Sequence, residues 1–316
     1  MQALYDMLAV PFGWVLSFFY DIFSNYLVAL FVLTLLVKLI LLPSSISQQK
    51  NSAKQARLQP KINRIRQKYS NGGQPTREMQ MKIQEETQAL YQKEGFSPMS
   101  GGCAPLLIQF PIMIGLYGVV RTPISKVLNI STDFINKAAA ALNITTDAKS
   151  ANDLEIKLLS ALNADNIPDS LKAYSDEILK LKDQFMLFGK LDLTQTPQWK
   201  EPSILWLIPA LVLVLGLITG FIMFNKQKQQ NPEMAKNPSM GCMTFMAPLM
   251  SVWFTFMFPA GVGVYWIISS FFTLIQTVVL NFTHSPQKIV ARNMIDETIE
   301  RRSKEESIKK IKEFEK

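Results

Sequence analysis

Apolar residues fall into five stretches that are each long enough to cross a bilayer. The stretches are residues 26–43, 103–120, 204–224, 241–258 and 261–282. At ~1.5 Å of rise per residue, about twenty helical residues span the ~30 Å hydrocarbon core of a membrane. The pattern therefore predicts an all-α integral membrane protein with five transmembrane helices.

The charges between these stretches predict their orientation. Residues 44–102 carry ten basic and four acidic side chains, 225–240 carry three and one, and 283–316 carry nine and seven. Residues 122–203 carry nine basic and eleven acidic side chains. Because cytoplasmic loops are enriched in Lys and Arg, the first three segments are predicted inside and the fourth outside. This places the N-terminus outside and the C-terminus in the cytoplasm.

The pattern divides the chain into ten segments. Residues 1–25 show apolar positions at helical spacing and predict an amphipathic helix on the outer surface, with an uncleaved membrane anchor as the alternative. Two polar arms, about 47–69 and 76–93, predict a helical hairpin in which Pro60 kinks the first arm. The predicted order is 1–25 external amphipathic helix, 26–43 first span, 44–102 cytoplasmic hairpin, 103–120 second span, 121–203 extracellular segment of two or three short helices, 204–224 third span, 225–240 cytoplasmic loop, 241–258 fourth span, 261–282 fifth span and 283–316 basic cytoplasmic tail.

Lys38 interrupts the first apolar stretch. A lysine at such a position costs roughly 2.5–3.5 kcal/mol on insertion scales unless water or a partner relieves it. No Asp or Glu occurs in any of the five stretches, so the membrane holds no carboxylate to pair with it. Either the ammonium snorkels to the interface, since it lies about five residues from the end of its helix, or it faces a hydrated cavity that receives a polar ligand.

Polar residues in the fifth stretch form one stripe. Tyr265, Ser269, Thr273 and Gln276 fall within roughly 80° of one another on a helix, and Trp266 flanks them. Such residues commonly hydrogen-bond neighbouring membrane helices, which is the structural alternative to a binding role.

Depth favours a shared binding region. Lys38, Gln109 and Gln276 all lie five or six residues from the predicted inner ends of their helices, which is roughly 8–10 Å inside the cytoplasmic face. We therefore predict that the five helices enclose a hydrophilic groove open to the cytoplasm and the inner leaflet. The predicted groove residues are Lys38, Gln109, Gln276, Tyr265, Trp266, Ser269 and Thr273.

Three motifs resemble the YidC/Oxa/Alb family of membrane protein insertases, in their five-span, Gram-positive form. They are TLLVKLILLP at 34–43, GGCAPLLIQFPIMIGLY at 101–117 and FPAGVGVYW at 258–266, with Gln276 following. The position of Lys38 is typically arginine in that family, and the segment 122–203 is longer than the family pattern suggests.

The resemblance implies a function and partners. A protein of this family is expected in the bacterial cell membrane, where it draws the polar segment of a nascent membrane protein into the positive groove and releases the apolar span into lipid. It needs no nucleotide hydrolysis. The resemblance further implies that the hairpin receives clients and that the basic tail contacts the ribosome, and it makes the Sec translocon a candidate partner. No recognition of a nucleic-acid sequence is expected.

Other chemistry finds no support in the sequence. His284 is the only histidine, so no Cys/His metal cluster is expected, and no G-x-x-x-x-G-K-[ST] motif occurs. Cys103 and Cys242 each open a span at its predicted cytoplasmic end, where no disulfide is expected. The chain is predicted to be no enzyme and to need no metal or cofactor. A small-solute or anion transporter using Lys38 is the alternative, although internal repeats and matched broken spans are missing from the sequence. A membrane-anchored scaffold acting through the hairpin is a third hypothesis.

Overall fold

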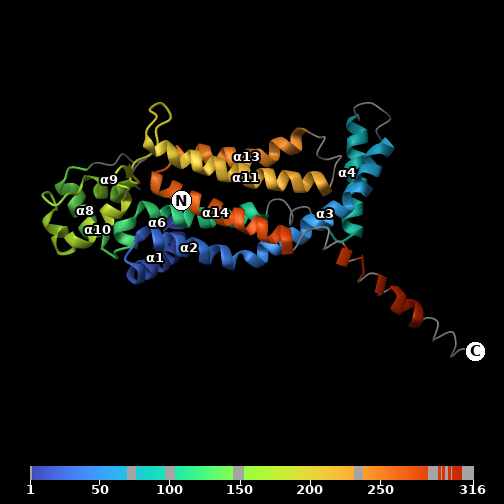
Figure 1. Cartoon of the computed structure of the whole chain (residues 1–316), viewed down its shortest axis with the longest axis horizontal. Coiled ribbons are helices and arrows are strands. Elements are labelled where there is room, and N and C mark those ends of the chain that lie inside the picture. The colour runs from blue at the N-terminus through green and yellow to red at the C-terminus, as the bar shows by residue number, and fades with distance from the viewer. Residues whose placement is uncertain are drawn as a thin grey trace, which may run out of the picture. The chain divides into compact units, whose positions relative to one another are not determined.

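The computed structural model describes residues 2–69, 76–96, 104–144, 153–230, 238–283 and parts of 291–307 (Figure 1). The chain forms two compact units, which are described separately. The first unit comprises Met1–Ile40, Leu106–Phe224 and Pro238–Ile275, and the second comprises Leu41–Pro105, Asn225–Asn237 and Gln276–Lys316.

Long helices make up most of the first unit. They are α1 (Gln2–Phe23), α2 (Tyr26–Ile40), α6 (Ala104–Arg121), α11 (Leu207–Gln230), α13 (Pro238–Thr255) and α14 (Ala260–Thr283). Four correspond in place to predicted spans two to five, and α2 occupies most of the first.

Two helices in the described part of the chain are long and apolar enough to cross a membrane alone, Ile204–Lys226 and Ala260–Thr283. A third span arises if α2 and the following helix, α3 (Leu42–Tyr69), count together as one bent span. The structure therefore supports a helical membrane protein, and the number five stays a prediction.

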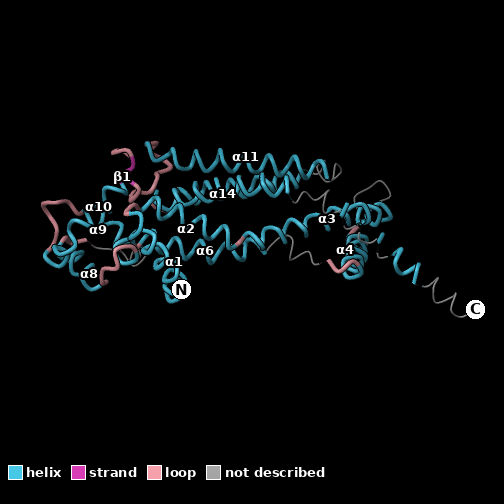
Figure 2. Tube along the Cα trace, turned by 60° about the horizontal axis from the view of Figure 1, so that its bottom comes forward, coloured by secondary structure: helices cyan, strands magenta, loops and turns pink. Residues whose placement is uncertain are grey.

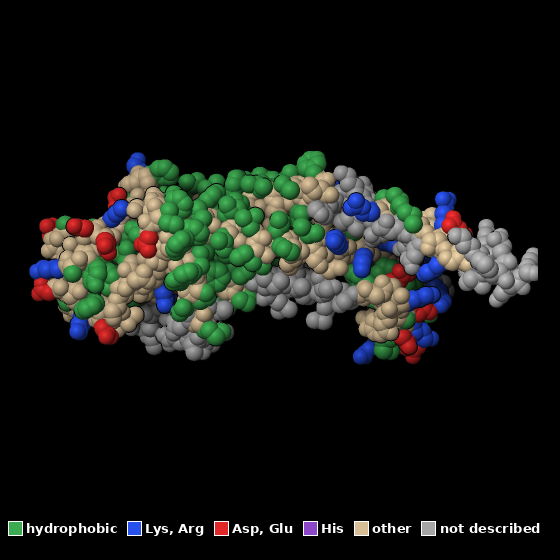
Figure 3. Space-filling view, turned by 90° about the horizontal axis from the view of Figure 1, so that it is seen from below, with side chains coloured by type: hydrophobic (Ala, Val, Ile, Leu, Met, Phe, Trp, Pro, Cys, Tyr) green, Lys and Arg blue, Asp and Glu red, His purple; other side chains and the backbone are tan. Residues whose placement is uncertain are grey.

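The surface of these helices is apolar. On α11 the exposed hydrophobic side chains recur at helical spacing, at Leu207, Leu211, Val214, Ile218 and Phe221. Figure 3 shows hydrophobic side chains gathered over the helices of the first unit. A patch of this extent is unfavourable in water and fits contact with lipid.

Residues 123–144 and 153–206 build a small folded body, which we call the cap. Its elements are α7 (Pro123–Lys126), α8 (Thr132–Ala141), α9 (Leu154–Ala161), η2 (Asp169–Tyr174), α10 (Ser175–Phe185), β1 (Met186–Leu187), β2 (Leu191–Asp192) and η3 (Ile204–Trp206). The antiparallel pair β1–β2, with Met186 opposite Asp192, was not predicted. Two or three short helices were predicted here, whereas the described residues hold four α-helices and two 3-10 helices, which form a body with its own buried side chains.

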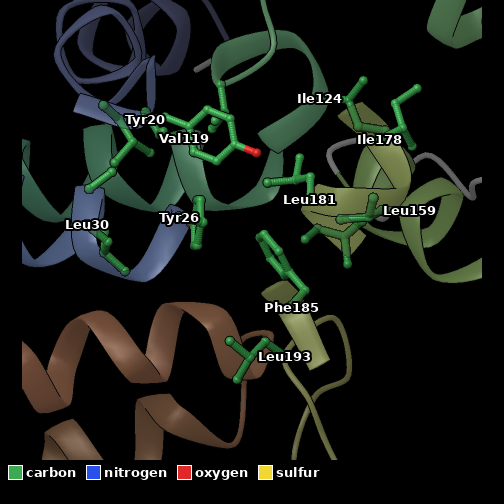
Figure 4. Close-up of a cluster of buried hydrophobic side chains, with 14 of the residues drawn as sticks. Tyr20, Tyr26, Leu30, Val119, Ile124, Leu159, Ile178, Leu181, Phe185 and Leu193 are labelled. Carbon is green, nitrogen blue, oxygen red and sulfur yellow. The ribbon is translucent and has the colours of Figure 1, made fainter. Parts of the chain in front are cut away.

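The cap shares its hydrophobic core with α1, α2 and α6. Figure 4 shows the buried cluster, in which Phe185 at the end of α10 meets Tyr26 at the start of α2, with ring centroids 4.6 Å apart. Gln184 reinforces this junction, because its Oε1 accepts a hydrogen bond of 2.7 Å from the Tyr26 backbone N–H and its Nε2 donates to the Ser24 carbonyl at 2.9 Å. The first bond satisfies one of the backbone donors that every helix leaves open at its N-terminus. The cap is thus joined to the beginning of α2 by both packing and hydrogen bonds.

Helix α1 has two apolar faces. One packs inward through Leu16 and Tyr20, and the Ser17 hydroxyl donates to the Val127 carbonyl in the cap at 3.1 Å. The other face is exposed and carries Met7, Val10, Trp14, Phe18 and Ile22. A position in the membrane surface would cover this second face, so the predicted interfacial helix stays our interpretation.

The second unit contains a helical hairpin. Helices α3 and α4 (Arg77–Lys93) pack through Leu58, Ile62 and Phe96, which are buried. Lys68 pairs with Glu86 at 2.6 Å, and α3 continues through Pro60. The predicted turn at residues 70–75 lies outside the described residues. Near the end of α14, Asn281 accepts a hydrogen bond of 3.4 Å from Gln49 Nε2, which links α3 to that helix within this unit.

Glu155 is a buried carboxyl within the cap. It lies in α9 and accepts two hydrogen bonds from Ser125, from the backbone N–H at 2.9 Å and from Oγ at 2.6 Å. Burial is the main cause that raises the pKa of Glu155 above its ordinary value, while the bonds from Ser125 act in the opposite direction.

This raised pKa predicts a pH dependence of cap stability. The folded cap binds the Glu155 proton more tightly than the unfolded chain does, so the contribution of this group is full below about pH 4.5 and falls as pH rises through the folded pKa. We expect Glu155→Gln to flatten that slope, measured as the unfolding midpoint against pH from mildly acidic to neutral. An identical slope in the wild type and the variant would exclude Glu155 as its source.

Candidate functional site around Lys38

Lys38 lies near the end of α2 and reaches α14. Its Nζ donates a hydrogen bond of 2.9 Å to Thr273 Oγ1, and that hydroxyl donates to the Ser269 carbonyl at 2.8 Å. One turn earlier on α2, Thr34 is buried and its hydroxyl donates to the Leu30 carbonyl at 2.7 Å. Two helices far apart in the sequence therefore bring polar groups together around one ammonium.

The ammonium is held by a neutral partner. Within the described residues, every ion pair of the protein involves another basic side chain, so none neutralises Lys38. Thr273 accounts for one of the three N–H donors of the ammonium. A half-buried cation in this state favours water or an incoming anion as its further partner.

Helices α2 and α14 also touch through their apolar side chains. The rings of Phe31 and Phe272 lie 4.9 Å apart between centroids. Phe31, Phe271 and Ile275 remain exposed beside this contact. The polar contact at Lys38 is thus bordered by an apolar surface that both helices contribute.

The predicted stripe on α14 divides between two environments. Tyr265 and Ser269 are buried, and Tyr265 belongs to the large core that includes α2. Trp266 instead packs against two rings of the α13 region, stacked on Phe254 at a centroid distance of 6.1 Å and tilted against Phe258 at 5.8 Å. Its ring serves helix packing in this structure, and of the stripe it is Thr273 that contacts Lys38.

The two glutamines of the predicted groove are less closely defined. Gln276 is half-buried, one turn beyond Thr273 on α14, and belongs to the second unit. Gln109 lies within α6, and its side chain falls outside the described residues. Their place in a common groove with Lys38 stays a prediction.

Arg121 is a buried charge that the sequence analysis did not single out. It ends α6, is 7% exposed, pairs with Asp153 in the cap and stacks over the Tyr117 ring at 4.7 Å. It also donates a hydrogen bond to the Tyr117 hydroxyl. The sequence did hold a signal for this contact, because Tyr117 and Arg121 lie one helical turn apart at the end of an apolar stretch. Because its charge is paired within the protein, Arg121 is a structural link between α6 and the cap and differs in kind from Lys38.

No group of three or more potential metal-binding side chains occurs among the residues that the structure describes. The site around Lys38 consists of one cation, hydroxyls and apolar surface. Such a set of groups suits the attraction of a negative or polar group.

Comparison with known proteins identifies the family. Residues 18–287 match the family described as 60Kd inner membrane protein. The chain is 27% identical to membrane protein insertase YidC 2 of Listeria innocua over 272 residues, which is 86% of this chain and 69% of the relative. It is 28% identical to membrane protein insertase MisCA of Bacillus subtilis over 258 residues, or 81% and 70% of the two chains. For membrane protein insertase YidC 1 of Halalkalibacterium halodurans the identity is 25% over 286 residues, or 90% and 81%.

These matches confirm the resemblance seen in the three motifs. The relatives come from Gram-positive bacteria, as the resemblance implied. The matches also agree with the prediction that the chain is no enzyme, because the relatives are named as insertases. The YidC-type insertases are relatives of this chain, and its apolar helices agree with a place in a bacterial membrane. The chain belongs to the 60Kd inner membrane protein family.

Proposed function

We propose that the protein is a membrane protein insertase that uses Lys38 to draw in the polar segment of a nascent membrane protein. The observation that carries this proposal is the unneutralised ammonium of Lys38, held by Thr273 between α2 and α14. A cation with donors to spare attracts acidic and polar groups, and the names of the relatives supply the type of client.

The free energy for insertion comes from the client. Moving an apolar segment of about twenty residues into lipid is favourable, and the barrier is the polar segment that must cross with it. A hydrated groove around Lys38 shortens the apolar path for that segment. For an acidic segment the membrane potential adds ~2.3 kcal/mol per charge per 100 mV. No nucleotide hydrolysis is required.

The client span leaves along α2 and α14. Phe31, Phe271 and Ile275 expose apolar surface next to the Lys38–Thr273 contact. A client could therefore keep its polar segment near Lys38 while its apolar span slides along these side chains into lipid.

The proposal extends to the topology of the chain and to its partners. We propose five spans with the N-terminus outside and the C-terminus in the cytoplasm, from the distribution of basic residues. The hairpin α3–α4 would receive clients and the basic tail 283–316 would contact the ribosome. The Sec translocon is a candidate partner on the family resemblance alone.

Water access at the proposed groove can be measured directly. In a background with Cys103→Ser and Cys242→Ser, we expect Lys38→Cys, Gln109→Cys and Gln276→Cys to react with a water-soluble maleimide added from the cytoplasmic side. Val214→Cys, on the exposed apolar face of α11, is the matched control and should be inert because it faces lipid. If position 38 were as unreactive as position 214, the groove would be dry and Lys38 would be a snorkelling residue.

The anion transporter hypothesis relies on the same ammonium and differs in its product. Flux of small anions from liposomes containing the purified protein, at a rate that depends on Lys38, would support it. Insertion of a client without such flux would support the insertase.

A further inference from the structure

The hairpin β1–β2 of the cap has an unfavourable residue at its tip. Phe188 has φ of 55° and is followed by Gly189 with φ of 64°, and the Lys190 N–H donates to the Leu187 carbonyl at 3.1 Å. This is a turn with positive φ at both central residues, which Asn-Gly suits and which strains a bulky side chain. Phe188 is also 93% exposed. Its ring therefore contributes nothing to the core of the cap, and the turn would form more easily without it.

The cap carries a second exposed aromatic side chain. Trp199 is 65% exposed, and its ring meets Phe256 at 4.6 Å and Trp206 at 5.9 Å. Trp206 precedes α11 and donates its Nε1–H to the Gln198 carbonyl at 2.9 Å, and Phe256 follows the end of α13. The cluster thus marks the ends of two long apolar helices.

Backbone hydrogen bonds join the chain just after the hairpin to the start of α14. The carbonyls of Leu193 and Gln195 accept bonds of 2.8 Å from the Gly261 and Ala260 N–H groups, at the start of α14. Strand β2 also packs against η3, which leads into α11. Figure 2 shows strand β1 near the beginning of α11. Phe188 and Trp199 therefore lie at the N-terminal ends of the two helices that can each cross a membrane alone.

The surface continues into the lipid-facing side of α11. Ile204, Leu207 and Leu211 are 51%, 53% and 40% exposed and follow Trp199 along the chain at roughly helical spacing. An aromatic side chain at the end of such an apolar stripe matches the belts of aromatic residues found at membrane interfaces.

The charges around the two aromatic side chains balance. Lys190 and Lys200 are offset by Asp192 and Glu201, and Asp192 is already bonded to Thr194 and Gln195. A strongly acidic or basic partner would find no net charge here. An apolar surface with a neutral rim favours the interface of a bilayer over a charged protein.

We propose that Phe188 and Trp199 anchor the cap in the membrane interface at this end of the spans. The tip of β1–β2 dips between lipid head groups, and burial of the Phe188 ring in lipid offsets the unfavourable turn. The anchor holds the cap close to the bilayer beside the start of α11, and it depends on apolar contact more than on charge.

Fluorescence quenching tests the anchor. In the background with Cys103→Ser and Cys242→Ser, Phe188→Cys is labelled with a polarity-sensitive fluorophore and the protein is reconstituted in phosphatidylcholine vesicles. Lys137→Cys is the control, because Lys137 is exposed on α8 and Figures 1 and 2 show the helix α8 well away from α11. We expect nitroxide-labelled phosphatidylcholine to quench position 188 several-fold more than position 137, and aqueous iodide to show the reverse order. Equal quenching of both positions by iodide would overturn the proposal, and so would protection of position 188 from both quenchers, because protein would then cover it.

A second variant separates anchoring from folding. With the label at Lys190→Cys, Phe188→Asn should reduce quenching by the lipid nitroxide several-fold, while Phe188→Trp should retain it. The thermal midpoint of Phe188→Asn in detergent should equal or exceed that of the wild type, because asparagine suits the turn. Lipid quenching that Phe188→Asn leaves unchanged would show that the ring is no anchor.

Discussion

Lys38→Glu is expected to abolish insertion of clients whose external segment is acidic. Among the described residues the wild-type ammonium has no carboxylate partner and donates a hydrogen bond of 2.9 Å to the neutral Thr273 hydroxyl, so its charge acts on whatever enters. Two unit charges about 4 Å apart interact by about 4 kcal/mol at an effective dielectric constant near 20. Reversing the sign turns this attraction into repulsion, and every ~1.4 kcal/mol corresponds to a tenfold change. The measurement is protease protection of the client segment after insertion.

A series at this position separates charge from shape. Lys38→Arg should retain insertion because it keeps the cation, and Lys38→Ala should lose it for acidic segments more than for neutral ones. Thr273→Val keeps the cation and removes its hydroxyl partner, so its effect should be smaller than that of Lys38→Ala. Lys137→Glu makes the same charge change on the cap and should insert normally. If Lys38→Glu inserted acidic clients normally, the proposed role of the Lys38 charge in the groove would be wrong.

Phe185→Ala is expected to detach the cap from α2. The Phe185 ring is 1% exposed and meets Tyr26 with centroids 4.6 Å apart, so truncation leaves a cavity at the junction. Loss of a buried phenylalanine ring typically lowers the free energy of unfolding by about 3–5 kcal/mol, and we expect a loss of that size here. Resistance of residues 123–206 to limited proteolysis across a denaturant series measures the change.

Phe188→Ala is the matched control for this prediction. Phe188 lies three residues further along, has the same side chain and is 93% exposed, so its truncation in detergent should leave the denaturation midpoint unchanged. Equal midpoints for Phe185→Ala and wild type would mean that the cap is not held through this junction.

Local periodicity was sufficient to place the long helices. The apolar run around Lys38 predicted a helix at 26–43, and the polar stripe at 265–276 predicted a continuous helix that α14 now spans. The hairpin β1–β2 escaped prediction because its strands have two residues each, too few for an alternating pattern. The shared core of the cap and α2 also escaped, since the contact of Tyr26 with Phe185 joins residues far apart in the chain.

Part of the candidate site was also predictable from the local sequence. A lysine in an apolar stretch is visible in the sequence, and so are the hydroxyls of α14. Which hydroxyl meets Lys38 depends on how the two helices pack, and the structure selects Thr273. Trp266 lies next to Tyr265 in sequence, yet a rotation of about 100° per residue turns it toward Phe254 and Phe258.

Insertion of membrane proteins without nucleotide hydrolysis is the function that we propose for this chain. The most direct test supplies purified wild-type protein in liposomes with a single-span client carrying an acidic N-terminal segment, and omits nucleotides and all other proteins. Protection of that segment from external protease, well above the level in protein-free liposomes, is the predicted result. If protection were no greater than in protein-free liposomes, or appeared only when nucleotide was added, the proposed function would be wrong.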